Sequence, residues 1–85
     1  MRNDRIRLVE RVAEDWAGLS PQERDLCIAA FQALDDDPIA GVPLFDPLRG
    51  YWSYRTKWLR LVYRIEVQAR FVVVLNVSRV AEVAS

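Results

Sequence analysis

Residues 59–66 read LRLVYRIE, and this stretch decides the fold that the sequence predicts. Every second residue is apolar or aromatic: Leu59, Leu61, Tyr63 and Ile65. The residues between them are Arg60, Val62, Arg64 and Glu66, of which three are charged. A strict period of two is typical of a strand with one buried and one open face. We therefore expect an extended segment that turns Tyr63 towards the core and Arg60 away from it.

Two more strands are predicted on either side, at residues 51–56 and 70–77. The later one, which contains the run FVVVLNV, is apolar on both sides and is typical of a central strand. The connections near 56–58 and 67–69 are too short for a parallel crossover. All of these pairings are therefore predicted to be antiparallel.

The N-terminal half predicts helices. Ser20 and Glu23 have the spacing of a capping box, with Pro21 at the first helical position between them. An apolar stripe follows at helical spacing and ends before Pro38; its members are Cys27, Ala30, Phe31 and Leu34. Upstream, residues 5–8 alternate like a short strand that runs into a helix near 10–18.

The segment 38–50 contains three prolines and two glycines and is predicted to be a loop. Together these elements predict a single α+β domain over residues 1–85. An N-terminal helical hairpin would pack on a twisted antiparallel sheet of three to four strands.

Charge is balanced overall but not along the chain. Twelve basic and twelve acidic side chains cancel, which argues against a strongly basic nucleic-acid binder. Residues 1–48 hold five Arg against ten Asp and Glu, while residues 49–85 hold six Arg and one Lys against two Glu. The two parts thus carry −5 and +5, and we expect a positive field on one side of the molecule.

The single cysteine, Cys27, excludes an internal disulfide and suits a reducing compartment. The N-terminus has no apolar run typical of a signal peptide, and the run at 71–77 is too short to span a bilayer. We expect a cytoplasmic protein without a membrane partner. Cys27 falls on the apolar helical stripe and is expected to be an inert core thiol.

Four short motifs resemble the RelE/ParE superfamily, the toxins of type II toxin–antitoxin modules. They are PLRG at 47–50, YR at 54–55, RLVYRI at 60–65 and VVLNVSR at 73–79. The resemblance implies a RelE-like domain of two helices on a four-stranded sheet, whose open face carries the function. In ribonuclease members, cations on that face hold the mRNA backbone, and a Tyr or His near the C-terminus assists attack by a ribose 2′-hydroxyl. In the ParE branch the target is DNA gyrase.

The resemblance places functional cations at Arg60 and Arg79. An arginine there suits phosphate and transition-state contacts, so both are the predicted catalytic residues. Further candidates for contacts with RNA or another target surround them: Arg55, Lys57, Trp58 and Arg64. The competing interpretations are a solvated strand face, edge protection and aromatic packing within the hairpin.

The departures from the family leave open whether the protein is an enzyme. The chain has no histidine, and Val83 or Ala84 stands where the ribonucleases have Tyr. Arginine is a poor general base, so Glu82 is the nearby carboxylate candidate. No cofactor or metal is predicted, because histidine is absent and the Asp cluster at 35–37 reads as a helix end.

Three hypotheses follow from the resemblance. The chain is a toxin acting on mRNA and translation, a non-nucleolytic inhibitor of gyrase, or a degenerate member that only pairs with its antitoxin. The expected partner is a cognate antitoxin encoded by an adjacent gene, bound through a helix or extended acidic segment. A homodimer is left open.

Overall fold

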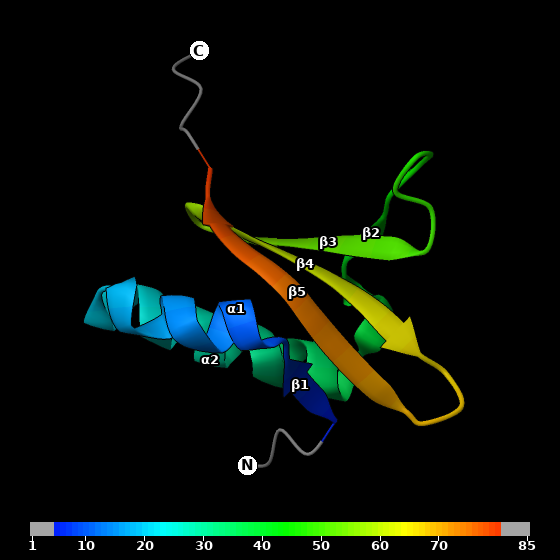
Figure 1. The fold of residues 1–85 in the computed structure, drawn as a ribbon, viewed down its shortest axis with the longest axis horizontal. Helices are drawn as coiled ribbons and strands as arrows, with labels where there is room; N and C mark the ends of the chain where they lie inside the picture. Colours follow the sequence, from blue (N-terminus) through cyan, green and yellow to red (C-terminus); the bar gives the residue numbers. More distant parts are fainter. Residues whose placement is uncertain (1–4, 81–85) are drawn as a thin grey trace.

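The computed structural model describes residues 5–80, which form helices on one side of a twisted sheet (Figure 1). Two α-helices are present, α1 (Glu10–Asp15) and α2 (Pro21–Asp36), with 3₁₀ turns at Trp16–Gly18 and Pro38–Ala40. The strands are β1 (Ile6–Leu8), β2 (Val42–Pro43), β3 (Tyr51–Thr56), β4 (Leu59–Glu66) and β5 (Phe71–Arg79). The predicted α+β class is confirmed.

The sheet has five strands in the order β1-β5-β4-β3-β2. The three long strands pair antiparallel as predicted, but β1 runs parallel to β5, with Ile6 beside Val72. The prediction of a wholly antiparallel sheet with three to four strands was therefore wrong. A parallel pair of strands needs a long connection. The segment between β1 and β5 meets this need, because it contains both helices and strands β2, β3 and β4.

Two strand boundaries also differ from the prediction. The expected loop at 38–50 contains β2, whose Val42 pairs with Ser53 at the far edge of the sheet. β5 continues to Arg79. Its last residues are polar and lack the apolar signal that identified the rest of the strand.

α2 begins as the sequence predicts. The Ser20 hydroxyl accepts from the Glu23 amide at 3.1 Å, and the Glu23 carboxylate accepts from the Ser20 amide at 3.0 Å. This reciprocal pair satisfies two backbone donors that a helix start leaves without partners. Among the described residues, no helix is long and apolar enough to cross a membrane.

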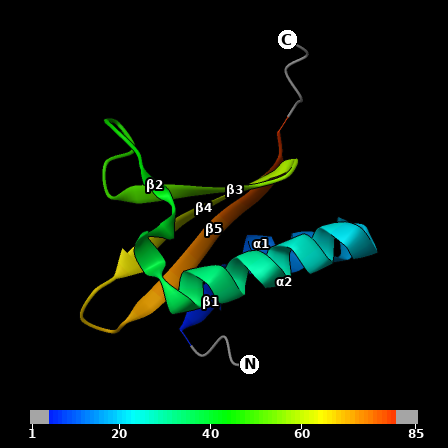
Figure 2. The same ribbon diagram turned by 180° about the vertical axis from the view of Figure 1, so that it is seen from behind.

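The core lies between α2 and one face of the sheet, as Figure 2 shows from behind. Leu59, Leu61 and Tyr63 are fully buried there, which confirms the predicted parity of β4. Cys27 is also buried, on the predicted stripe of α2, and burial raises the pKa of its thiol. Phe31 stacks on Trp16, with ring centroids 6.2 Å apart.

Tyr63 fixes the chain that follows α2. Its hydroxyl donates to the Pro38 carbonyl at 2.7 Å and accepts from the Gly41 amide at 3.1 Å. A Cβ at position 41 would come within 2.6 Å of both the Tyr63 Oη and the Ser53 carbonyl oxygen. Only glycine allows this approach, which brings β2 to the edge of β3.

β5 contains a bulge at Leu75, since Val62 pairs with Asn76 while its neighbour Tyr63 pairs with Val74. Arg11 of α1 binds this bulge from the side. Its Nη2 donates to the Leu75 carbonyl at 3.1 Å and to Asn76 Oδ1 at 2.8 Å. Beyond the bulge β5 continues to pair with β4, and its last residues lie beside the β3–β4 turn.

Candidate functional site: the open face of the sheet

The helices leave one face of the sheet uncovered, and we call this the open face. On β4 it receives the side chains that alternate with the buried ones. Residues that pair directly across strands share a face, so the register defines its members. They are Arg7 on β1; Val42 on β2; Tyr51, Ser53 and Arg55 on β3; Arg60, Val62, Arg64 and Glu66 on β4; and Phe71, Val73, Asn76 and Ser78 on β5.

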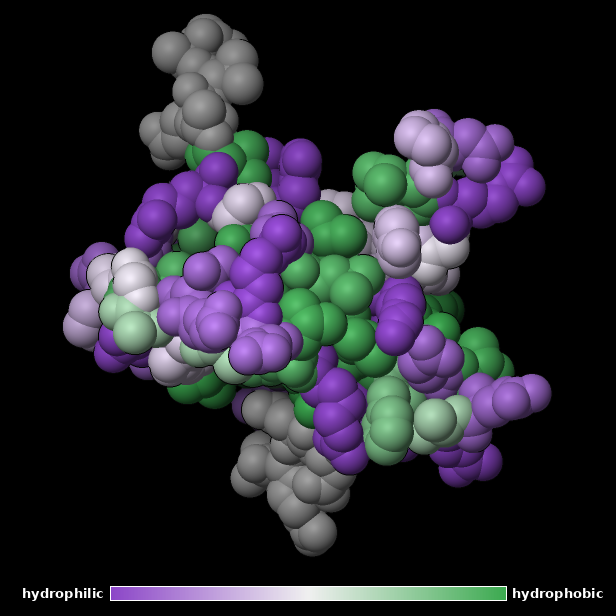
Figure 3. Space-filling view, viewed as in Figure 1, coloured by the Kyte–Doolittle hydropathy of each residue, from purple (hydrophilic) through white to green (hydrophobic). Residues whose placement is uncertain are grey.

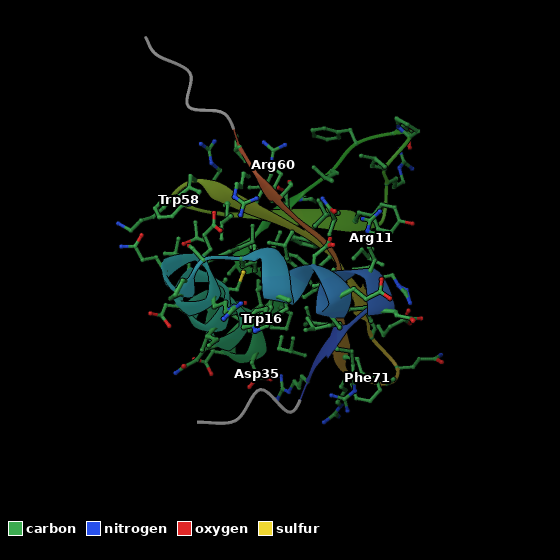
Figure 4. The ribbon with its side chains drawn as sticks, turned by 60° about the vertical axis from the view of Figure 1, so that its left-hand side comes forward. Arg11, Trp16, Asp35, Trp58, Arg60 and Phe71 are labelled. Carbon is green, nitrogen blue, oxygen red and sulfur yellow. The ribbon has the colours of Figure 1, made fainter. Side chains whose placement is uncertain are left out.

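Arg55 and Arg60 form a directly opposed pair on this face. Both are exposed, and Ser78 lies opposite Arg60 on the other side. Figure 4 shows Arg60 on the side of the sheet away from the helices. Arg55 Nε donates to the Lys57 carbonyl at 3.3 Å, whereas Arg60 has no hydrogen-bond or ion-pair partner within residues 5–80.

Two guanidinium groups in opposed positions repel each other, so the pair is destabilising in the absence of an anion. A phosphate or carboxylate bound between them would remove that repulsion and accept charge-assisted hydrogen bonds. Lys57 adds a third cation in the β3–β4 turn, where it is exposed and has a φ of 52°. This end of the open face is therefore a candidate anion-binding site.

The far end of the open face is also cationic but is internally paired. Arg64 forms an ion pair with Glu66, with Nη1 2.9 Å from Oε1. The Arg7 guanidinium lies 4.1 Å from the centre of the Phe71 ring, a cation–π contact. Figure 4 shows Phe71 at the opposite end of the sheet from Arg60.

Apolar side chains separate the two cationic ends. Val62 and Val73 belong to the open face between them. In the direction seen in Figure 3, hydrophobic side chains gather over the middle of β5 and hydrophilic ones border them. Four residues along β4 correspond to roughly 13 Å, so Arg64 and Arg60 are too far apart to bind one phosphate group together.

Arg79 lies on the opposite face of the sheet. It pairs with Leu59, which is fully buried against the helices, and its own side chain turns to the start of α2. There its Nε is 2.7 Å from Glu23 Oε2 and its Nη2 is 2.7 Å from Glu23 Oε1. Arg79 and Arg60, the two predicted catalytic residues, therefore project from opposite faces of the sheet, and their catalytic role stays a prediction.

Trp58 also belongs to the helix side. Its indole Nε1 donates to Glu23 Oε2 at 2.8 Å, and its ring packs against the core. Trp58 was predicted as a target-binding candidate around Arg60, but it does not lie on the open face with Arg60. Of the six predicted residues, the open face holds Arg55, Arg60 and Arg64, with Lys57 in the adjoining turn.

Similar solved structures share the fold of this chain. A chain of the RelBE2 toxin–antitoxin complex from Mycobacterium tuberculosis matches with a TM-score of 0.81 and 32% sequence identity, covering 87% of this chain and 94% of that chain. This chain belongs to the RelE/ParE superfamily of toxins. A scan against protein-family models and a comparison with curated proteins gave no match.

Two further structures show the same RelE-like fold at lower identity. The isolated RelE toxin of E. coli matches with a TM-score of 0.76 and 18% identity, over 92% of this chain and 85% of that one. The archaeal RelE–RelB complex of Pyrococcus horikoshii matches with a TM-score of 0.75 and 11% identity, over 96% of this chain and all of that one.

In this RelE/ParE superfamily member, sequence reasoning missed three polar residues. Arg7 was seen only as part of an alternating strand, yet the β1–β5 pair places it on the open face. Arg11 was not singled out, although it reaches the β5 bulge. Glu23 was assigned only to the capping box, and no local signal indicates that it also binds Trp58 and Arg79.

Few groups near Arg60 can move a proton. On the open face within residues 5–80, the carboxylate is Glu66, six residues from Arg60 or roughly 20 Å along the strand. Tyr51 lies opposite Arg64, at the far end. The predictions for Glu82, Val83 and Ala84 fall outside the described residues. Within residues 5–80 no cluster of three or more His, Cys, Asp or Glu is arranged to hold a metal ion.

Proposed function

We propose that this superfamily member is the toxin of a type II toxin–antitoxin module and blocks translation by binding mRNA on its open face. The observation that carries the proposal is the opposed pair of Arg55 and Arg60, which are exposed on one face with no carboxylate beside them among residues 5–80. Arginine binds phosphate in a bidentate way, and a pair of them suits a polyanion better than a single carboxylate.

The shape of the open face also favours an extended ligand. Cations lie at both ends of β4, and apolar side chains lie between them. A single-stranded nucleic acid presents phosphates at regular spacing with bases in between, so it matches both features. We infer that Arg55, Arg60 and Lys57 hold one phosphate group, and that the Arg64 end contacts the strand further along.

A cognate antitoxin is the second proposed partner. Two of the similar structures, from M. tuberculosis and P. horikoshii, are toxin–antitoxin complexes. The open face of the present chain is cationic, so the segment that neutralises it is expected to be acidic. Expression of the chain should arrest growth, and co-expression of the open reading frame beside its gene should restore growth.

The test of the first proposal is a cell-free translation reaction with the purified protein added. Incorporation of labelled methionine measures synthesis, and primer extension on the message measures cleavage. We expect the wild-type protein to stop synthesis and the Arg55→Gln/Arg60→Gln variant to have little effect. Arg49→Gln is the matched control, since Arg49 is an exposed cation paired with Asp46 away from the sheet. Equal inhibition by the double variant would disprove the proposal.

One observation favours the ParE-like alternative, a non-nucleolytic inhibitor of DNA gyrase. A nuclease needs a group that accepts a proton, and near Arg60 the described part of the open face offers the hydroxyls of Ser53 and Ser78 but no carboxylate. A gyrase supercoiling assay separates the two. Loss of supercoiling at protein concentrations that leave cell-free translation intact would favour gyrase as the target.

A further inference from the structure

Glu23 is a point at which three separate parts of the chain meet. Its two carboxylate oxygens receive four hydrogen bonds, from the Ser20 amide, the Trp58 indole and two nitrogens of Arg79. Trp58 lies 35 residues from Glu23 in the sequence, and Arg79 lies 56 residues from it. The carboxylate thus joins the start of α2, the β3–β4 turn and the end of β5.

The burial of Glu23 exceeds what its capping role requires. A carboxylate in the first turn of a helix normally stays in water, where it needs only the backbone amide. Here Glu23 is 4% exposed. The β3–β4 turn and β5 are also bonded to each other, because the Val80 amide donates to the Trp58 carbonyl at 2.8 Å. These two segments cover the carboxylate together.

We propose that Glu23 is a positioning residue, which binds Arg79 on the helix side of the sheet and, through the indole of Trp58, fixes the turn that presents Arg55 and Lys57. The proposal rests on the proposed function, in which those cations bind RNA. It assigns Arg79 a structural role in this chain and gives the open face alone the contact with phosphate.

Two observations indicate that the Arg79 side chain stays bound to Glu23. Removing its guanidinium would leave a buried carboxylate with only neutral donors, and a buried charge without its partner is strongly destabilising. A phosphate bound beside Arg60 would also lie on the other face of the sheet from Arg79, since Arg79 pairs with the buried Leu59 and not with Arg60. The Nη2 of Arg79 is further held by the Gly18 carbonyl at 3.3 Å.

The turn depends on the same carboxylate. Lys57 has a left-handed backbone conformation, which a non-glycine residue adopts at a cost that its surroundings must balance. Trp58 is its neighbour, and the indole bond to Glu23 anchors the turn to α2. Without that anchor, Lys57 and the adjacent end of β3 with Arg55 would sample more conformations, so the cations would bind phosphate less well.

The test compares Glu23→Gln with Glu14→Gln. Both changes remove one negative charge, and Glu14 lies close to Arg79 but has no hydrogen bond or ion pair to it within the described residues. The probe is a fluorescein-labelled single-stranded RNA oligonucleotide, and its binding is followed by anisotropy. We expect Glu23→Gln to bind at least about threefold more weakly than Glu14→Gln, and addition of Arg79→Gln to Glu23→Gln to leave the affinity unchanged within about twofold.

The same binding measurements can also contradict the inference. If Glu23→Gln binds RNA as tightly as Glu14→Gln or more tightly, Glu23 does not position the turn. If Arg79→Gln then lowers the affinity of the Glu23→Gln variant, Arg79 is an RNA ligand and the inference is wrong. If Glu23→Gln fails to fold, Trp58→Phe replaces it, because this variant keeps the Glu23–Arg79 pair, removes the indole donor and retains an aromatic ring against the core. It should also weaken RNA binding at least about threefold, and unchanged binding would overturn the inference.

A second measurement separates this inference from the proposed function. The ¹⁵N order parameter of the Lys57 amide reports the turn without any RNA. We expect it to fall in Glu23→Gln and to stay at the wild-type value in Glu14→Gln. If the wild-type protein binds no RNA but this difference is seen, the proposed function fails and the positioning role stands. If the order parameter is the same in both variants, the positioning role fails.

Discussion

Arg55 and Arg60 lie directly opposite each other on β3 and β4, on the face of the sheet that the helices leave open. A protein selected only for stability would not place two like charges in that relationship, because opposed like charges destabilise a strand pair. Natural proteins keep such local conflicts mainly where function requires them. The proposed phosphate-binding site therefore rests on this pair.

The first prediction is that Arg60→Gln stabilises the free protein. Removing one of two opposed cations should raise the free energy of unfolding by about 0.5 kcal/mol at low salt, and the gain should shrink at high salt, where the repulsion is screened. Urea unfolding at two salt concentrations measures this. A loss of stability in Arg60→Gln at low salt would mean that the two guanidinium groups do not oppose each other.

The second prediction concerns the hydroxyl of Tyr63. Tyr63→Phe removes one donor and one acceptor, and leaves the Pro38 carbonyl and the Gly41 amide without that partner. Both residues are partly buried, and an unsatisfied buried group costs about 1–3 kcal/mol, so a loss of about 2 kcal/mol is expected in urea unfolding. Tyr54→Phe is the matched control, since the Tyr54 hydroxyl makes no hydrogen bond within residues 5–80. Equal losses in both variants would contradict the role given to Tyr63.

The third prediction compares the stability effects of alanine substitution at Gly41 and at Gly18. In Gly41→Ala the new Cβ would meet the Tyr63 Oη and the Ser53 carbonyl at 2.6 Å, so the chain must shift. Overpacking of this kind costs about 1–3 kcal/mol. At Gly18 a Cβ meets no atom within 4 Å, and Gly18→Ala should be nearly neutral. Thermal unfolding of both variants tests this difference, and a neutral Gly41→Ala would refute the close approach of β2.

The fourth prediction is a pH dependence from Glu23. The Arg79 guanidinium, the Ser20 amide and the Trp58 indole lower the pKa of this carboxyl from its ordinary value of 4.5 to about 2. A lowered pKa in the folded state means that the stabilisation is fully present above about pH 4.5 and is lost as the pH falls towards about 2. The stability gap between wild type and Glu23→Gln should therefore be constant near neutral pH and shrink across that interval.

Urea unfolding of the wild type and Glu23→Gln at several pH values measures this gap. A gap of the same size at about pH 3 and about pH 7 would mean that Glu23 is not held in its charged form by these donors.

Local signals were enough to predict much of the fold. The Ser20–Glu23 spacing located the start of α2, and the alternation in LRLVYRIE gave β4 with its buried and open faces. These features depend on residues a few positions apart. The parallel pair of β1 and β5 was missed, because it joins Ile6 to Val72 and no short-range pattern encodes such a distant partner.

The candidate site was predicted in part for the same reason. Strand parity placed Arg60 correctly, and the turn position brought Arg55 beside it. Arg79 was grouped with them because the family motif ends there, but its face depends on the register after the bulge at Leu75. Its partner, Glu23, lies 56 residues away, so the ion pair that occupies Arg79 becomes visible only in three dimensions.

The most direct measurement of the central claim is the salt dependence of RNA binding by the wild type and by the Arg55→Gln/Arg60→Gln variant. Each phosphate contact on a single strand contributes about 0.7 to the slope of log K against log salt. We predict that the double variant binds at least about tenfold more weakly and that its slope is smaller by about 0.7 or more, whereas Arg49→Gln matches the wild type. An unchanged affinity and slope in the double variant would show that this face does not hold the phosphate backbone.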